Sequence, residues 1–188
     1  MKKLSIIIPA YNEERSISQI LGSKDSTAEK CRQFMQAHPD LDIHYHLQPF
    51  NQGKGAALRT GIALATGDWI IIQDADLEYD PEDYNPLLQW VIENNAKVVY
   101  GSRFLKPSNK HSYLRFYLGG RLVTFVTNLL YGQHLTDEPT CYKFFDAQFL
   151  KSIPLKCQGF EFCPEVTAKV CKKGIKIHEI PINYYPRS

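Results

Sequence analysis

The stretch Trp69-Ile70-Ile71-Ile72-Gln73-Asp74-Ala75-Asp76 decides the fold class. Four consecutive large apolar residues, three of them β-branched, are typical of a strand that is buried on both faces of a sheet. Asp74 and Asp76 follow at once, and the two-residue period of an extended chain points both side chains the same way. The pattern predicts a buried strand with two carboxylates at its carboxyl end, where open α/β sheets bind their ligands.

Similar strands alternate with helical patterns along the rest of the chain. The other strand candidates are Leu4 to Pro9, Lys97 to Tyr100, Lys176 to Ile180 and, more weakly, Ile43 to Leu47. Apolar residues at helical spacing follow Gly53, Pro81 and Glu161. This alternation predicts an α/β protein with a mostly parallel sheet that is covered by helices on both faces.

Composition limits the class of protein. The chain has 188 residues, of which 44% are apolar and 22% charged, as in an ordinary soluble domain. A net charge of +2 is too small for a protein that binds nucleic acid over its whole surface. Five cysteines without a C-x-x-C pair indicate reduced thiols rather than a zinc ribbon or a disulfide framework. With no secretory signal and no long apolar run, we expect a cytoplasmic protein that is at most peripheral to a membrane.

The two carboxylates after the buried strand suit a divalent cation. Mg²⁺ or Mn²⁺ prefers one or two carboxylates together with phosphate oxygens, so Asp74 and Asp76 would hold the ion against a nucleotide diphosphate. The alternative is that the two acids only cap the helix that follows Pro81. Glu78 and Asp80 already supply negative charge there, which favours the metal.

A glycine-flanked lysine, Gly53-Lys54-Gly55, begins the next helical pattern. Backbone N–H groups at a helix start and one ammonium suit a phosphate, which makes Lys54 a candidate donor-binding residue. The complete phosphate-loop pattern is missing, so a plain turn remains the alternative.

Five segments together resemble family 2 glycosyltransferases, and within them the polyprenyl-phosphate sugar transferases of the dolichol-phosphate mannose synthase type. The matching segments are IIIPAYNEE at residues 6–14, the run from Asn51 to Asp76, YGSRF at 100–104, TDEPTCYKFF at 136–145 and GFEF at 159–162. They follow the family's order over nearly the whole chain.

The resemblance implies a GT-A fold and a donor site for a nucleotide sugar. GDP-mannose or UDP-glucose would be the donor, and its hexose would move with inversion at the anomeric carbon. Pro9, Tyr11 and Glu13 would line the nucleotide pocket, and Asp74 and Asp76 would hold the metal, with Asp76 also assigned a catalytic role. Glu13 is equally well explained as an acid that stabilises a helix start.

The resemblance also implies a polyprenyl-phosphate acceptor at the cytoplasmic face of the membrane. Arg103 and Arg115 would grip the acceptor phosphate, for which a guanidinium fork is suited. Asp137 would lie near the sugar and acceptor as a catalytic-site group that orients rather than takes a proton. The chain would form a single domain over 1–188, with a nucleotide-sugar half at about 1–106 and an acceptor half at about 107–188.

One segment departs from the family. The second strand and its Asp-Asp are missing, because the chain runs from Ile17–Leu21 directly into Gly22. The expected result is that Ile43 to Leu47 pairs directly beside Leu4 to Pro9, since an exposed apolar edge invites aggregation. This departure also keeps open a non-catalytic nucleotide-binding subunit as an alternative function. A family 2 transferase with a polysaccharide or protein acceptor is a further alternative.

The segment from His111 to Tyr131 mixes aromatic and aliphatic residues with arginines, as segments at a membrane interface do. We expect it to contact the membrane peripherally, and an ordinary core helix is the competing interpretation. Glu161 and Glu165 are candidates for contacts with sugar hydroxyls, against the alternative of a solvated helix face.

Overall fold

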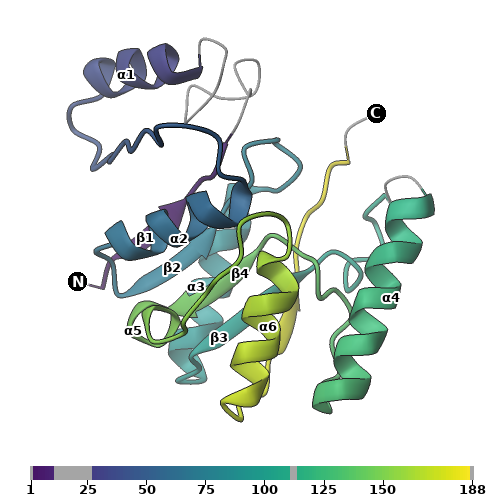
Figure 1. Ribbon diagram of the computed structural model, residues 1–188. Helices are drawn as coiled ribbons and strands as arrows, with labels where there is room; N and C mark the ends of the chain where they lie inside the picture. The colour runs from purple at the N-terminus through teal and green to yellow at the C-terminus, as the bar shows by residue number, and fades with distance from the viewer. Residues whose placement is uncertain (1, 11–26, 111–113, 187–188) are drawn as a thin grey trace.

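The computed structural model describes residues 2–10, 27–110 and 114–186, and in these ranges the chain forms a five-stranded sheet (Figure 1). Across the sheet, the strands lie in the order β1 (Leu4–Ile7), β2 (Trp69–Ile72), β4 (Lys143–Asp146), β3 (Val98–Ser102) and β5 (His178–Pro181). β4 runs antiparallel to both of its neighbours, and the other four strands share one direction. The sheet is therefore mostly parallel, and the carboxyl ends of four strands meet at one edge.

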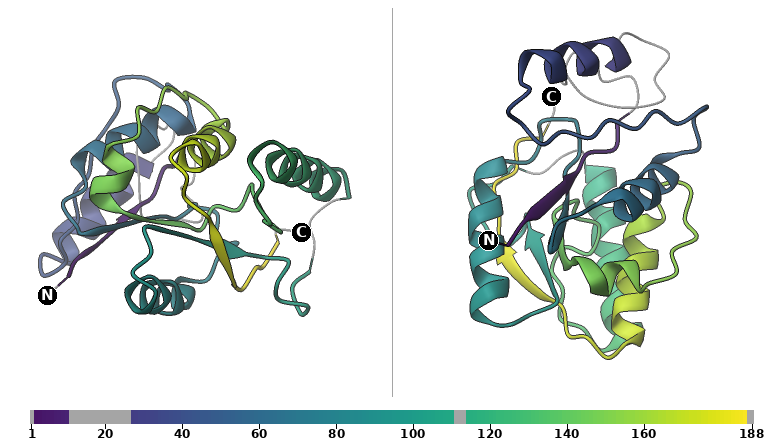
Figure 2. Two further views of the ribbon diagram at one scale, coloured as in Figure 1. Left: turned by 90° about the horizontal axis from the view of Figure 1, so that it is seen from below. Right: turned by 90° about the vertical axis from the view of Figure 1, so that its left-hand side faces the viewer.

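Helices cover both faces of this sheet. They are α1 (Thr27–Ala37), α2 (Lys54–Leu64), α3 (Tyr84–Glu93), α4 (Leu114–Tyr131), α5 (Ala147–Lys151) and α6 (Phe162–Lys172), and a short 3₁₀ turn, η1 (Pro81–Asp83), leads into α3. Figure 2 shows α3 on one face and α2, α5 and α6 on the other, while α1 stands apart from the sheet. α4 packs against α6. The two-sided cover explains why β2 is continuously apolar and completely buried.

The apolar spacing of each helix determines the face that it buries. Leu87 and Val91 are four residues apart in α3 and both are buried. Phe162, Val166 and Val170 repeat the same spacing in α6 and are buried as well. These side chains join those of β2, β3 and β4 in one apolar core.

The strands predicted at 69–72, 4–9, 97–100 and 176–180 are confirmed as β2, β1, β3 and β5, with small shifts at their ends. β4 was not anticipated. Its apolar stretch is only Phe144 and Phe145, between Lys143 and Asp146. Lys143 is nevertheless fully buried, because its ammonium donates to the carbonyls of Glu138 and Thr140 and lies 4.4 Å from the centre of the Tyr100 ring.

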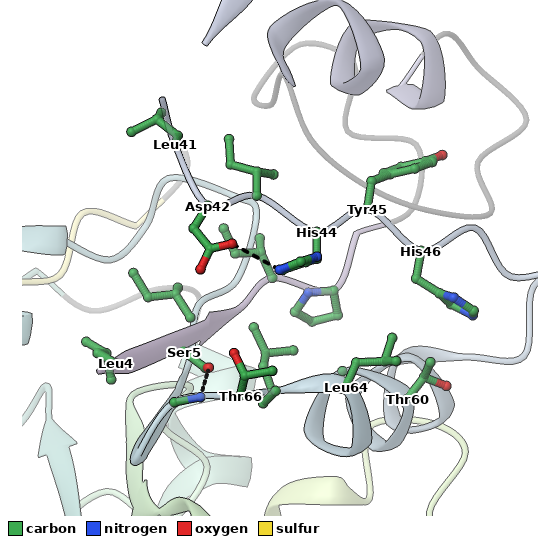
Figure 3. A pocket seen from close by; sticks show the side chains of 18 of the residues that line it. Leu4, Ser5, Leu41, Asp42, His44, Tyr45, His46, Thr60, Leu64 and Thr66 are labelled. Atoms are coloured by element: carbon green, nitrogen blue, oxygen red, sulfur yellow. Dashed lines mark hydrogen bonds and ion pairs between the residues drawn. The ribbon is translucent and has the colours of Figure 1, made fainter. Parts of the chain in front are cut away.

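The predicted pairing of Ile43 to Leu47 with β1 is wrong. Residues 43–47 form no strand, and within the part of the chain that the structure describes β2 is the only strand that pairs with β1. Both segments line one cavity, which lies between them where the pairing was expected (Figure 3).

Candidate functional site

Asp74, which follows β2, forms an ion pair with Lys54, the first residue of α2. Lys54 Nζ lies 2.5 Å from Asp74 Oδ1, and about a fifth of each side chain is exposed. The structure therefore brings together two of the predicted donor-site residues from segments 20 positions apart.

The start of α2 is fixed by close packing against the loop of residues 156–161. Gly53 has a φ of 87°, and a Cβ there would lie 2.4 Å from the carbonyl oxygen of Gln158. The N–H of Ala56 donates to the same carbonyl at 3.1 Å. Only glycine fits at residue 53, and Lys54 consequently has a fixed position beside the carboxyl end of β2.

Asp76 belongs to a tight turn after β2. Its Oδ1 accepts a hydrogen bond from the N–H of Glu78 at 3.1 Å, and the intervening Leu77 has a φ of 63°. A left-handed conformation is costly for leucine and is found most often where a neighbouring group must be held in place. Asp74 and Asp76 are both partly exposed at the same end of β2.

Asp74 and Asp76 are the described residues that could hold a magnesium or manganese ion. Asp74 already faces a positive charge, the Lys54 ammonium, and oxygen ligands are those that such ions prefer. Across residues 2–10, 27–110 and 114–186 there is no cluster of three or more histidine, cysteine or acidic residues arranged to enclose an ion. A site with two carboxylates leaves coordination positions for phosphate oxygens, as Mg²⁺ usually requires.

Gln73 supports Asp74 from within the core. Its Nε2 donates to the Asp74 carbonyl at 2.8 Å, and its Oε1 accepts from the hydroxyls of Tyr84 and Tyr142. Burial raises the pKa of Tyr84 to about 12, so this hydroxyl stays protonated and keeps donating. The sequence analysis did not single out Gln73, although its position directly before Asp74 was a usable signal.

Arg103 follows β3 and is held by Asp137. Arg103 Nε donates to Asp137 Oδ2 at 2.7 Å and one terminal nitrogen donates to Oδ1 at 2.7 Å, so the pair is bidentate. The backbone N–H of Arg103 donates to Oδ2 as well, at 2.9 Å. The side chain of Asp137 is fully buried, while 19% of that of Arg103 is exposed. This arrangement favours an orienting role for Asp137, which remains a prediction.

Glu179 on β5 positions Asp137 in turn. Its carboxylate accepts from the N–H groups of Thr136 and Asp137 at 2.6 and 2.9 Å, and from the Thr136 hydroxyl at 2.8 Å. Burial raises the pKa of Glu179, and these three hydrogen bonds act in the opposite direction. Sequence reasoning missed Glu179 because it lies 42 residues away from Asp137.

The arginines of α4 occupy different surroundings. Arg115 lies exposed on the first turn, with its guanidinium carbon 4.7 Å from the centre of the Phe116 ring. Arg121 donates to the Thr136 carbonyl at 3.0 Å and lies 5.3 Å from the Phe104 ring. Arg103 lies 5.9 Å from that same ring, which places Arg121 close to the Arg103 region. Arg103 and Arg115, but not Arg121, were predicted from the sequence to bind phosphate.

The remaining predicted site residues are in three places. Pro9 is buried just beyond β1, whereas Tyr11 and Glu13 lie outside the described residues. Glu161 accepts from the N–H groups of Gln158 and Gly159, at 2.7 and 3.0 Å. Glu165 accepts from those of Lys156 and Cys157, so both acids bind the 156–161 loop in this structure.

A cavity of about 590 Å³ lies along β1 (Figure 3). It is bounded by β1, by residues 41–48 and by the outer side of α2. Two buried polar atoms of the 41–48 segment, Tyr45 Oη and Gln48 Oε1, have no hydrogen-bond partner among the described residues. His44 pairs instead with the exposed Asp42, at 3.0 Å.

All five cysteines are free thiols. Burial raises the pKa of Cys157 to about 12 and that of Cys171 to about 11, and it also raises those of Cys141 and Cys163. These four thiols therefore stay neutral at pH 7. Of the helices that the structure describes, none has both the length and the apolar character to cross a bilayer.

Solved structures show the same fold. A glucosyl-3-phosphoglycerate synthase of Mycobacterium tuberculosis superposes with a TM-score of 0.65 over 100% of this chain and 73% of that chain, at 17% sequence identity. A mycobacterial protein described only as such gives a TM-score of 0.71 over 100% of this chain and 68% of that chain, at 18% identity. These likenesses establish the GT-A fold.

Curated relatives have similar sequences over almost the whole chain. A dolichyl-phosphate beta-glucosyltransferase of Trichomonas vaginalis is 27% identical over 96% of this chain and 65% of its own length. A low-salt glycan biosynthesis hexosyltransferase of Haloferax volcanii is 27% identical over 98% of this chain and 48% of its own. A UDP-N-acetylglucosamine–dolichyl-phosphate N-acetylglucosaminyltransferase of Methanococcus voltae is 28% identical over 96% and 85%. The chain thus spans less than two thirds of the first two relatives.

The family itself follows from a match that covers most of the chain. The sequence model described as glycosyl transferase family 2 matches residues 22–153, a span that contains Lys54, Asp74, Asp76, Arg103 and Asp137. Together with the fold and the acidic end of β2, this match identifies the chain as a member of glycosyl transferase family 2.

Proposed function

We propose that this protein transfers a hexose from a nucleoside diphosphate sugar to a polyprenyl phosphate at a membrane surface. The observation that carries the proposal is that two ion pairs lie at the same edge of the sheet. Asp74, which is paired with Lys54, follows β2, and Arg103, which is paired with Asp137, follows β3. One group is suited to a diphosphate with its metal, and the other is suited to a second phosphate. The dolichyl-phosphate transferases among the relatives support this class of acceptor.

The donor side would consist of Pro9, Tyr11, Glu13, Lys54 and Asp74. Asp74 and Asp76 would hold Mg²⁺ or Mn²⁺, which supplies charge neutralisation for the departing diphosphate. Structures of the mycobacterial synthase with Mn²⁺ and UDP-glucose support a divalent ion and a nucleotide sugar here. GDP-mannose and UDP-glucose are the donors to test first.

The acceptor side would use Arg103 and Arg115 to bind the lipid phosphate. A phosphate is already ionised at pH 7, so its oxygen attacks the anomeric carbon without a strong general base. In the proposed inverting displacement, the new carbon–oxygen bond forms as the bond to the nucleoside diphosphate breaks. Asp137, which is fully buried, would keep the Arg103 guanidinium facing the phosphate.

Contact with the membrane would come from α4. In this helix the buried side chains are polar and the exposed ones are apolar, which is the reverse of an ordinary amphipathic helix on a soluble protein. Its buried side chains are Thr124 and Thr127, which are polar. Large apolar residues are exposed along it instead: Leu114, Phe116, Leu118, Leu122, Val123, Phe125, Val126, Leu129 and Leu130. An apolar surface of this length, with Arg115 and Arg121 beside it, suits the interface of an anionic bilayer at the cytoplasmic face.

Transfer of radiolabelled hexose to a short-chain polyprenyl phosphate tests the proposal. We expect transfer from GDP-mannose or UDP-glucose in Mn²⁺ or Mg²⁺, with loss of at least a hundredfold in Asp76→Ala and Arg103→Ala. Ile92→Ala, an exposed position on α3, is the matched control and should transfer normally. Absence of transfer from every donor would contradict the proposal.

The membrane part is tested separately by sedimentation with anionic vesicles. Replacing both Phe125 and Leu129 by serine should reduce vesicle binding at least tenfold and leave transfer to a water-soluble short-chain acceptor nearly unchanged. Vesicle binding that is the same in the double variant would show that α4 does not make this contact.

A non-catalytic nucleotide-binding subunit is the second candidate function. It is favoured by the cavity along β1, which lies beside Pro9 on the proposed donor side of the site. This candidate predicts metal-dependent nucleotide binding by calorimetry together with no hexose transfer to polyprenyl phosphate, polysaccharide or protein acceptors.

A further inference from the structure

We infer that Phe160 forms the surface on which the donor hexose packs, with the apolar face of the sugar ring against its phenyl ring. Phe160 is the most exposed of the large apolar side chains, at 83%, yet it lies beside the polar end of the sheet rather than on α4. The ring centre is 5.7 Å from Lys54 Nζ. The inference rests on the proposed function, because it uses Lys54 and Asp74 as the donor phosphate site.

The exposure of Phe160 is not the result of a loose loop. The carboxylates of Glu161 and Glu165 accept four successive N–H groups, those of residues 156–159. On the other side, the Gln158 carbonyl accepts from Ala56 of α2. These bonds fix the loop backbone to the same helix start that carries Lys54, so the ring and the ammonium are held together.

The loop separates two phenylalanines with opposite surroundings. Phe162 begins α6 and is only 2% exposed, inside the core. Phe160, two residues earlier, projects into solvent. Keeping an apolar ring in water costs free energy that a bound partner recovers, so the fixed outward position points to a ligand.

A hexose is the ligand that fits this place. Lys54 forms an ion pair with Asp74, and a diphosphate that replaces this contact would carry its sugar on the outer phosphate, next to the ring. Sugar rings present C–H groups on one face and hydroxyls at the edges. An aromatic ring binds the first, and the nearby charged side chains bind the second.

Calorimetric titrations in Mn²⁺ with UDP-glucose and UDP, and with GDP-mannose and GDP, test the inference. In Phe160→Ala we expect the affinity for the sugar nucleotide to fall about tenfold, while that for the free nucleotide changes less than twofold. Phe160→Trp should keep the original affinity for the sugar nucleotide. Ile92→Ala, another exposed apolar position, should change neither affinity.

Other outcomes overturn the inference in distinguishable ways. If Phe160→Ala lowers the affinities for the sugar nucleotide and the free nucleotide equally, or lowers neither, the ring does not bind the hexose. The proposed donor site is then unaffected by this result. If only the KM for the polyprenyl phosphate rises, the ring contacts the lipid instead. If the unmutated protein binds no nucleotide at all, the proposed function fails together with the inference.

Discussion

The centre of the sheet and its β1 edge differ in how completely their side chains are buried. In the centre, Ile71 of β2, Val99 of β3 and Phe144 of β4 are completely buried and helices cover both faces. At the edge, Ile6 of β1 is 44% exposed and a cavity lies alongside the strand. Ile6 and Ile71 are direct partners in the β1–β2 ladder, so the contrast arises between two neighbouring strands.

This contrast also separates the predicted site residues, most of which belong to the closely packed strands. Asp74 and Asp76 follow β2, Arg103 follows β3 and Glu179 belongs to β5. Each therefore belongs to the closely packed centre, whereas Pro9 is the one predicted site residue among the described residues that belongs to the β1 side.

Ion pairs should give the largest difference between the two regions. Asp137→Ala leaves the Arg103 guanidinium unpaired in a largely buried place and should lower the free energy of unfolding by about 4 kcal/mol. Glu29→Ala, which breaks the exposed Glu29–Arg32 pair of α1, should cost less than about 1 kcal/mol. Urea denaturation measures both, and equal losses would remove the distinction between the regions.

The partner isoleucines give the next largest difference. Ile71→Ala should cost about 3 kcal/mol, because it leaves a hole in a fully buried place. Ile6→Ala removes a half-exposed side chain and should cost about 1 kcal/mol or less. A thermal or urea unfolding series checks the pair, and an equally large loss for Ile6→Ala would show that the β1 edge is packed in solution.

Adjacent alanines of α2 sharpen the comparison further. Ala57 lines the cavity, so Ala57→Leu should raise the free energy of unfolding by about 0.5 to 1 kcal/mol. Ala56 is buried in the core, and Ala56→Leu should lower it by about 1 to 2 kcal/mol through overpacking. Destabilisation by both substitutions would mean that the cavity has no room for the added carbons.

The smallest effect concerns pH and the 156–161 loop. Burial acts against the charge of Glu165, but hydrogen bonds from Lys169, Lys156 and Cys157 outweigh it and lower the pKa from 4.5 to about 2. A lowered pKa means that Glu165 stabilises the fold fully above pH 4.5 and loses this effect as the pH falls toward 2.

Glu165→Gln should therefore cost about 1 kcal/mol at pH 7 and almost nothing near pH 2, as measured by urea unfolding at both values. A cost in Glu165→Gln that is the same at both pH values would show that its charge is not involved.

Much of the architecture was predictable because its signals are local. The run from Trp69 to Ile72 specifies a buried strand by itself, and the two following aspartates mark its ligand-binding end. β4 was not predictable, because it places Lys143 in the core and relies on carbonyl partners that only the folded chain supplies. The predicted pairing of residues 43–47 with β1 was wrong because the sequence of a strand candidate does not show which other segment lies beside it.

Some residues of the candidate site were also predictable from local sequence signals, and others were not. Lys54, Asp74 and Arg103 follow glycines or strands and carry their own signals. Glu179 and Arg121 act through Thr136, which is distant from both in sequence, so no short pattern marks them. The exposure of Phe160 was equally invisible, because GFEF contains two phenylalanines and only the fold shows which one is buried.

The cavity beside β1 also has a volumetric consequence. A protein loses its internal voids when it unfolds, so a chain with a larger void occupies relatively less volume in the unfolded state. Hydrostatic pressure favours the smaller volume, so we expect the β1 side, where about 590 Å³ lies between the strand and residues 41–48, to be sensitive to pressure. Compression would loosen the β1 side, and the packed centre that carries the charged residues would yield last.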